Sequence, residues 1–107
     1  MFNKAIHITS DNFESEVIKS DIPVLLIFSA EWCSTCQVME GIVESAMKDF
    51  DKKIKFAVLD IDNEKTVCDK FGVLSVPTFM LFKGGVVTNK TIGAVPRSLF
   101  TAFLTGR

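Results

Sequence analysis

Two cysteines three positions apart, Cys33 and Cys36, are the residues of this sequence best suited to covalent chemistry. A cysteine thiolate can attack a disulfide, and a second nearby thiol can then resolve the mixed disulfide. Positions i and i+3 of a helix are neighbours, so the two sulfurs can reach bonding distance if the pair begins a helix. The free backbone N–H groups and the dipole of a helix N-terminus would lower the pKa of the Cys33 thiol. We therefore predict thiol–disulfide exchange, with Cys33 as nucleophile and Cys36 as resolving thiol.

Buried structural thiols and a metal site are the two other interpretations of this pair. A zinc ion or an iron–sulfur cluster within one chain needs about four ligands. The remaining candidates, Cys68 and His7, fall on distant elements. We therefore predict no metal within a single chain, while a metal bridging two copies stays open. We expect Cys68 to lie under a short helix as a structural residue, a regulatory thiol being the alternative, and we expect His7 to face solvent without a catalytic role.

Composition narrows the class of protein. The chain has 107 residues, 48% of them hydrophobic, and a net charge of −1, which is typical of one globular domain spanning residues 1–107. The charge balance argues against nucleic-acid binding, and no apolar run approaches the ~18–20 residues that span a membrane. Three cysteines, an odd number, argue against a disulfide-stapled secreted domain. The N-terminal residues contain no apolar signal region, so we expect a cytoplasmic protein.

The elements that must position the cysteines are predicted by two changes of hydrophobic period. Residues 24–30 are apolar except for Ser29, which predicts a strand covered on both faces. From residue 38 to residue 50 apolar side chains recur every three or four positions, which predicts an amphipathic helix of about four turns. A second central strand is expected over residues 54–62. Together these segments predict a right-handed βαβ unit with the cysteines at the start of its helix.

The rest of the chain predicts a mixed sheet of the α/β class. We expect an edge strand at residues 6–8, then a first helix capped by Thr9, Ser10 or Asp11. A short helix capped by Asp62 or Asn63 and ended by a glycine should follow the second central strand. Residues 78–83 and 86–92 are expected to form a hairpin, and a last helix should begin at Pro96 and bury Leu99, Phe100, Phe103 and Leu104. The predicted order is β-α-β-α-β-α-β-β-α, with helices on both faces.

Five short segments carry a family resemblance that covers almost the whole chain. In chain order they are Ala30-Glu31-Trp32-Cys33, Leu59-Asp60-Ile61-Asp62, Val76-Pro77-Thr78, Phe82-Lys83-Gly84-Gly85 and Gly93-Ala94. A Cys-x-x-Cys pair is a weak signal when it stands alone. In this order and context it is a strong one, and the sequence resembles the thioredoxin family.

The resemblance implies a thioredoxin fold, a central mixed β-sheet flanked by helices, and reduction of protein disulfides. It implies no bound cofactor, the redox-active group being the Cys33–Cys36 disulfide. Electrons would come from a flavoprotein of the thioredoxin-reductase type, and the substrates would be disulfide-containing proteins. The protein is expected to act as a monomer. Pro77 should be cis and lie against the dithiol. The residues implied to shape the site or bind substrate are Trp32, Ser34, Thr35, Val76, Pro77, Gly93 and Ala94.

Several residues depart from the family pattern. Ser34 and Thr35 stand where thioredoxins typically carry Gly-Pro, a dipeptide that affects the reduction potential. Ile27 replaces a buried aspartate and Val58 its lysine partner, so an ion pair gives way to two aliphatic side chains and the core should not suffer. Our hypothesis is that Cys36, without a carboxylate at position 27, keeps a higher pKa and resolves mixed disulfides more slowly.

Two further departures lie near the predicted site. Ser29 replaces an aromatic residue and should loosen a packing contact beneath the dithiol, and Gly41 replaces a proline that kinks the helix. These changes keep two alternatives open. One is a specialised redox partner with a shifted potential and few substrates. The other, from a different class, is a peptide-binding or metal-bridging module that performs no turnover.

Overall fold

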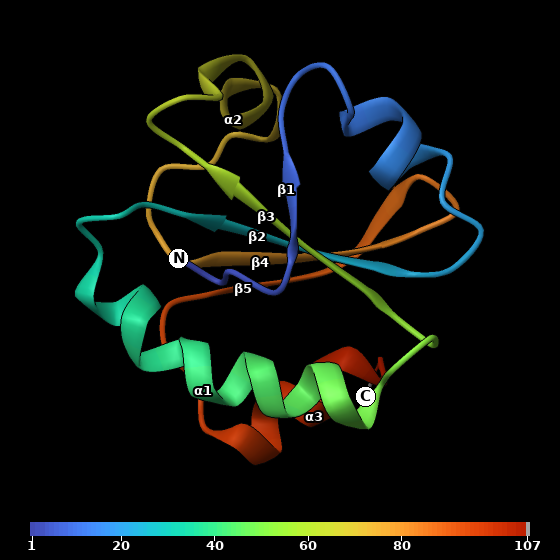
Figure 1. The fold of residues 1–107 in the computed structure, drawn as a ribbon, viewed down its shortest axis with the longest axis vertical. Helices are drawn as coiled ribbons and strands as arrows, with labels where there is room; N and C mark the ends of the chain where they lie inside the picture. Colours follow the sequence, from blue (N-terminus) through green and yellow to red (C-terminus); the bar gives the residue numbers. More distant parts are fainter. Residues whose placement is uncertain (107) are drawn as a thin grey trace.

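A five-stranded mixed sheet forms the centre of the computed structural model, which describes residues 1–106 (Figure 1). Across the sheet the strands follow the order β1 (Ile6–Ile8), β3 (Lys55–Asp60), β2 (Val24–Ser29), β4 (Thr78–Lys83) and β5 (Val86–Ile92). Strands β1 and β2 run parallel to β3, whereas β4 is antiparallel to both β2 and β5. The central strand β2 is therefore hydrogen-bonded on both edges, and all six of its residues are buried.

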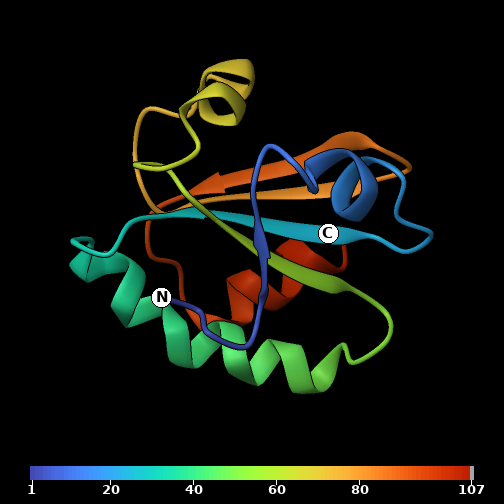
Figure 2. The same cartoon turned by 45° about the horizontal axis from the view of Figure 1, so that its top comes forward.

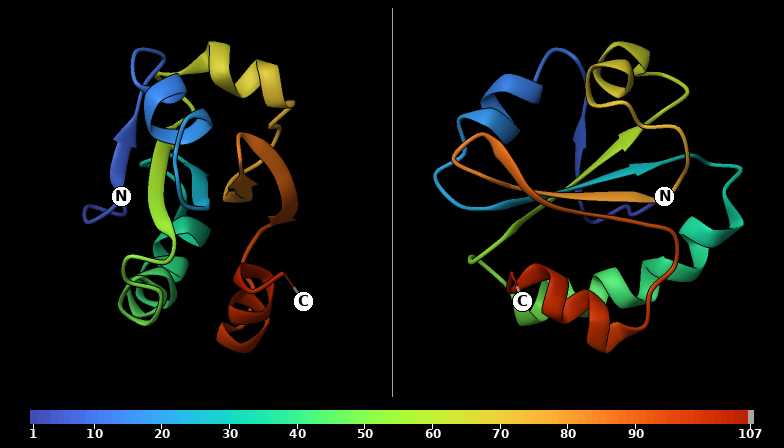
Figure 3. Two further views of the ribbon diagram at one scale, coloured as in Figure 1. Left: turned by 90° about the vertical axis from the view of Figure 1, so that its right-hand side faces the viewer. Right: turned by 180° about the vertical axis from the view of Figure 1, so that it is seen from behind.

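Helices cover both faces of this sheet. Helices α1 (Ser34–Asp49) and α3 (Arg97–Leu104) pack on one face, and η1 (Glu14–Ile18) and α2 (Lys65–Phe71) pack on the other (Figures 2 and 3). The order β1-η1-β2-α1-β3-α2-β4-β5-α3 confirms the predicted succession of elements. The connection from β2 through α1 to β3 is the predicted βαβ unit.

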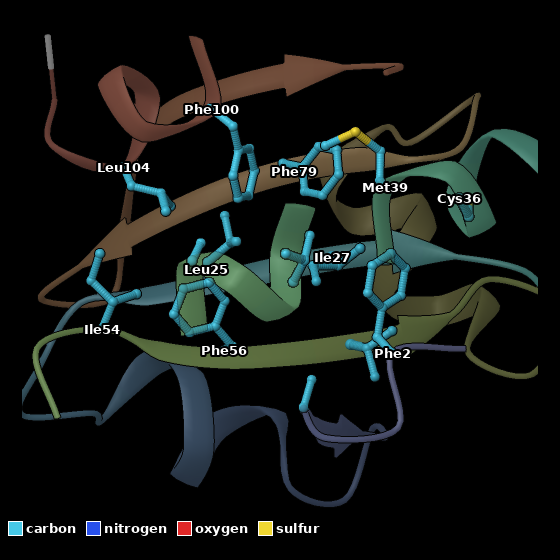
Figure 4. Close-up of a cluster of buried hydrophobic side chains, with 14 of the residues drawn as sticks. Phe2, Leu25, Ile27, Cys36, Met39, Ile54, Phe56, Phe79, Phe100 and Leu104 are labelled. Atoms are coloured by element: carbon cyan, nitrogen blue, oxygen red, sulfur yellow. The ribbon is translucent and has the colours of Figure 1, made fainter. Parts of the chain in front are cut away.

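Alternation along β2 divides the core into two layers. Because successive side chains of a strand point to opposite faces, Leu25 and Ile27 face α1 and α3, whereas Leu26 and Phe28 face η1 and α2. Figure 4 shows the first layer, which contains Ile27 of β2 and Cys36 of α1. In the second layer the ring centroid of Phe71 lies 5.6 Å from that of Phe82. The dithiol thus belongs to one layer and an aromatic cluster to the other.

The expected N-cap is wrong for α2 and holds in part for the first helix. Thr9 Oγ1 accepts a hydrogen bond from Asp11 N at 3.2 Å in the turn that leads into η1. Element η1 itself is a single π-helical turn whose N-cap residue is Phe13, without a side-chain cap. At α2 the N-cap residue is Glu64, without a side-chain cap. Asp62 instead accepts a hydrogen bond from Trp32. The Asp62 side chain is therefore engaged away from the start of α2.

The apolar face predicted for the last helix contains one error. Pro96 is the N-cap of α3, and Phe100 and Leu104 are buried, but Leu99 is 60% exposed. Residues 100, 103 and 104 share one helix face, and Leu99 lies about 100° away from Phe100 around the axis. The hairpin turn agrees with expectation, since Gly84 and Gly85 both have positive φ, 58° and 81°.

Candidate active site

The Cys33–Cys36 disulfide lies at the start of α1, with the two Cα atoms 5.3 Å apart. Cys33 is the N-cap residue in extended conformation, and its Sγ accepts a hydrogen bond from the backbone N–H of Cys36 at 3.1 Å. An oxygen from serine or aspartate usually fills this capping role. Here a sulfur accepts one of the free N–H groups and lies at the positive end of a 16-residue helix. This environment favours a thiolate at Cys33.

Several loops converge on the end of the sheet from which the dithiol loop departs. Phe28 pairs with Thr78, Ser29 pairs with Asp60, and Thr78 pairs with Ile92, so the last residues of β2, β3 and β5 lie beside the first of β4. The chain segments attached there are residues 30–33, 61–64, 75–77 and 93–96. All the residues predicted to shape the site or bind substrate belong to these segments or to the first turn of α1.

The segment before β4 has the backbone geometry expected of it. The Val76–Pro77 peptide bond is cis, and the Pro77 carbonyl accepts a hydrogen bond from Gly93 N at 2.8 Å. This bond joins the proline loop to the Gly93-Ala94 loop. Thr78 Oγ1 donates to the Ser75 carbonyl at 2.7 Å and closes the loop from its other side.

The sulfurs are nearly buried, and the large apolar side chain next to Cys33 in the chain is exposed. Cys33 is 5% and Cys36 is 2% exposed, whereas Trp32 is 67% exposed. The Trp32 indole N–H donates to Asp62 Oδ2 at 2.8 Å and ties the dithiol loop to the end of β3. Sequence reasoning missed this role of Asp62, and it also missed Leu74, which is 98% exposed in the loop before Pro77. The exposure of Leu74 is visible only in the structure, because the sequence alone does not show which leucines are buried.

Ile27 and Val58, which stand where the family carries a buried ion pair, lie in apolar surroundings. Ile27 and Val58 are register partners on β2 and β3, both essentially unexposed, and both pack in the layer that contains Cys36 and Met39. Two aliphatic side chains therefore fill the space without burying an unpaired charge.

A pocket of about 230 Å³ is lined in part by Cys36. Its lining includes Ser29 and Glu40, neither of which sequence reasoning gave a chemical role. The available signal for Glu40 was its position four residues after Cys36, which places both side chains on one helix face.

The third cysteine lies on the opposite face of the sheet. Cys68 is 6% exposed within α2, and burial, followed by the charges of Asp69 and Glu64, raises the pKa of its thiol. His7 is exposed on β1. Within residues 1–106, no three His, Cys, Asp or Glu side chains are grouped so as to hold a metal ion. No helix in this part of the chain has the length and apolarity needed to cross a membrane.

Comparisons with a family of known proteins and with individual proteins point to the same family. Residues 4–106 match the family described as Thioredoxin. "Thioredoxin" of Rickettsia bellii is 43% identical over 89 residues, which cover 83% of this chain and 85% of that protein. "Thioredoxin" of Pseudomonas aeruginosa is 36% identical over 104 residues, covering 97% and 96%, and "Thioredoxin 1" of a Nostoc species is 35% identical over 100 residues, covering 94% of each. The similarity therefore extends over most of each protein.

Proposed function

Because the chain belongs to the thioredoxin family and is a thiol–disulfide oxidoreductase, we propose that it reduces protein disulfides through Cys33 and Cys36. The observation that carries this proposal is the position of Cys33 Sγ at the N-cap of α1, where it accepts the N–H of Cys36. A hydrogen bond to sulfur and a helix N-terminus both stabilise the thiolate, which is the attacking species.

The proposed reaction has two exchange steps. In the first, Cys33 thiolate attacks one sulfur of the substrate disulfide, the substrate S–S bond breaks, and the departing sulfur leaves as a thiolate that takes up a proton. In the second, Cys36 loses its proton and attacks Cys33 Sγ, which forms the Cys33–Cys36 disulfide and releases the second substrate thiol. The substrate gains two electrons and two protons, and the two cysteines of the protein are oxidised.

We propose that an extended substrate segment binds beside Val76 in the manner of an added strand. Trp32, Pro77, Gly93 and Ala94 would form the apolar rim of this groove. The hydrogen bond between Gly93 N and the Pro77 carbonyl supports this assignment, because it holds two sides of the rim together. In the first turn of α1, the exposed Ser34 and Thr35 would tune the reduction potential.

The redox-active group of the proposal is the Cys33–Cys36 disulfide itself, without a bound cofactor. The electron donor would be a separate flavoprotein of the thioredoxin-reductase type. We further propose that residues 1–107 form a single domain that acts as a monomer in the cytoplasm.

Trapping of substrates tests the assignment of the two cysteines. Cys36→Ser should accumulate mixed disulfides with protein substrates, since Cys33 still attacks and nothing resolves the product. Cys33→Ser should accumulate none, and mass spectrometry of alkylated samples distinguishes the two. Mixed disulfides formed equally by Cys33→Ser would contradict the assignment.

Equilibration of the protein with glutathione tests the direction of the reaction. A potential well below the cytosolic poise of about −220 to −260 mV supports a reductase. A potential at or above that poise would instead indicate an oxidant, an isomerase or a dedicated redox partner. Absence of an intramolecular disulfide would remove the central claim.

A further inference from the structure

The pocket beside Cys36 joins three parts of the chain: the N-terminal segment, the end of β2 and the first turns of α1. Phe2, Ser29, Cys36 and Glu40 all line it. Figure 4 shows Phe2 and Cys36 on the same side of the sheet as Ile27. The pocket has a volume of about 230 Å³ and can hold several water molecules, each of which occupies about 30 Å³ in the liquid.

The Ser29 hydroxyl points into this region. Ser29 follows Leu25 and Ile27 at two-residue spacing on β2, so its side chain lies on the α1 face of the sheet. It is fully buried, and its Oγ makes no hydrogen bond to any other group of residues 1–106. A buried hydroxyl is costly without a partner, and a roomy pocket with polar walls allows water to supply one.

A carboxylate completes the polar wall. Glu40 lies four residues after Cys36 on α1, and helical side chains lean toward the N-terminus, so the Glu40 side chain is directed toward the turn that carries Cys36. Glu40 Oε1 accepts a hydrogen bond from Phe2 N at 3.3 Å, and the amino nitrogen of Met1 lies 3.8 Å away. With 35% of its side chain exposed, Glu40 lies between the pocket and bulk solvent.

Two other carboxylates lie near the pocket. Glu31 lines it from the exposed loop before Trp32. Asp60 is the register partner of Ser29, but its two oxygens accept hydrogen bonds from Asp62 N and Asn63 Nδ2, both at 2.9 Å, and it is not among the lining residues. Glu40 differs from both because it shares a helix face with the resolving thiol.

We propose that Glu40 accepts the proton of Cys36 through water held at the Ser29 hydroxyl during the second exchange step. The inference rests on the proposed roles of Cys33 and Cys36. The proton passes from Cys36 Sγ through water to the Glu40 carboxylate, and the resulting thiolate attacks Cys33 Sγ. The Cys33–substrate bond breaks, the substrate leaves as a thiolate, and Glu40 returns its proton to that thiolate or to solvent. The chain thereby supplies a carboxylate from α1 that position 27 does not offer.

A proton acceptor can be told apart from a bystander charge by the sign of one substitution. A nearby negative charge disfavours the thiolate, so a bystander Glu40 would raise the Cys36 pKa, and Glu40→Gln would then speed resolution near neutral pH. A proton acceptor has the opposite effect, because its removal slows resolution. Neutralisation of Glu40 therefore decides between the two roles.

Ellman's reagent in excess isolates the step. Attack by Cys33 releases one equivalent of chromophore, and the later attack by Cys36 releases a second in a phase that does not depend on reagent concentration. We expect Glu40→Gln to slow this second phase near neutral pH by at least ~10-fold and to shift its pH profile upward; a positioned general base typically contributes about 10²–10⁴-fold. Glu44→Gln, one turn further along α1 and outside this pocket, should match the wild type.

Further variants make each outcome decisive. Ser29→Ala should slow the second phase less than Glu40→Gln does, and Glu40→Asp should restore part of the rate, with thermal unfolding checking that each variant is folded. An unchanged or faster second phase in Glu40→Gln, or a slowdown confined to Glu31→Gln, would overturn the inference. Cys36→Ser must lack the second phase, and its persistence there would refute the proposed function instead.

Discussion

The two regions that carry cysteines lie on opposite faces of one sheet and differ in chemistry although their burial is similar. Cys33 and Cys36 are 5% and 2% exposed, and Cys68 is 6% exposed. Cys33 caps α1, and the N–H of Cys36 points at its sulfur. Cys68 lies within α2, where its own N–H is already bonded to the Glu64 carbonyl. Burial alone therefore does not select the reactive thiol.

Neighbouring charges also differ between the two regions. Around Cys68, burial first and then the carboxylates of Asp69 and Glu64 raise the pKa of the thiol. The first turn of α1 contains no acidic residue, and Cys33 receives the positive end of the helix. Position along a helix and the sign of neighbouring charges favour the thiolate at Cys33 and disfavour it at Cys68, which is the basis for proposing Cys33 as the nucleophile.

The strongest test of this contrast is to remove the Cys33 and Cys68 thiols in turn. We expect Cys33→Ser to abolish dithiol-driven reduction of a protein disulfide, leaving only the rate of the added thiol. Cys68→Ser should retain at least about half of the wild-type rate per folded molecule, since no step uses its sulfur. Turnover with a thiol reductant measures both. Loss of activity in Cys68→Ser, at a temperature where circular dichroism shows it folded, would break the comparison.

Alkylation of the fully reduced protein should separate the thiols next most strongly. Near neutral pH, iodoacetamide should modify Cys33 at least ~100-fold faster than Cys68, because the thiolate is the reacting species and the pKa of the Cys68 thiol is raised by burial and by nearby carboxylates, whereas Cys33 lies at a helix N-terminus. Peptide mass spectrometry of quenched samples gives the three rates. Comparable rates at Cys33 and Cys68 would show that burial dominates over charge. A urea-unfolded sample serves as the control, since all three thiols should then react alike.

Much of this contrast could be predicted from the sequence, because it depends on local patterns. The apolar run at 24–30 and the helical period after Cys33 are strong signals, and they place the dithiol at a helix start. The burial of Cys68 and the exposure of His7 also agree with expectation. Each of these features is determined by residues within a few positions of one another.

What could not be predicted depends on partners distant in sequence. Asp62 was expected to cap α2, but it accepts a hydrogen bond from Trp32, thirty residues away. Glu40 and Phe2 line the same pocket and are joined by a hydrogen bond that spans thirty-eight positions. No periodicity encodes such pairings, and polar residues at loop ends have several competing partners.

Alkaline unfolding provides a smaller test at Cys68. Its pKa is raised in the folded state above the unfolded value, so the protonated thiol contributes stability below the unfolded pKa, and this contribution is lost as pH rises through the folded pKa. With the Cys33–Cys36 disulfide kept oxidised, the free energy of unfolding should fall more steeply from pH 8 to pH 11 in the wild type than in Cys68→Ala. Urea titrations at several pH values measure this slope. Equal slopes would show that the fold places no constraint on ionisation of Cys68.

The smallest expected effect comes from single charges on the exposed side of α2. Asp69 raises the pKa of Cys68 and Lys65 lowers it, so Asp69→Asn should decrease that pKa and Lys65→Gln should increase it. Because the chain has no tyrosine, absorbance at 240 nm of the oxidised protein follows the Cys68 thiolate without tyrosinate interference.

The two variants control for each other, since both remove the exposed Lys65–Asp69 ion pair, whose N–O separation is 3.6 Å. Such pairs contribute about 0–1 kcal/mol, so the stabilities of the two variants should be nearly equal. Opposite shifts would then report charge alone. Shifts of the same sign would mean that rearrangement of α2 controls the thiol, and the contrast with Cys33 would then rest on helix position without the neighbouring carboxylates.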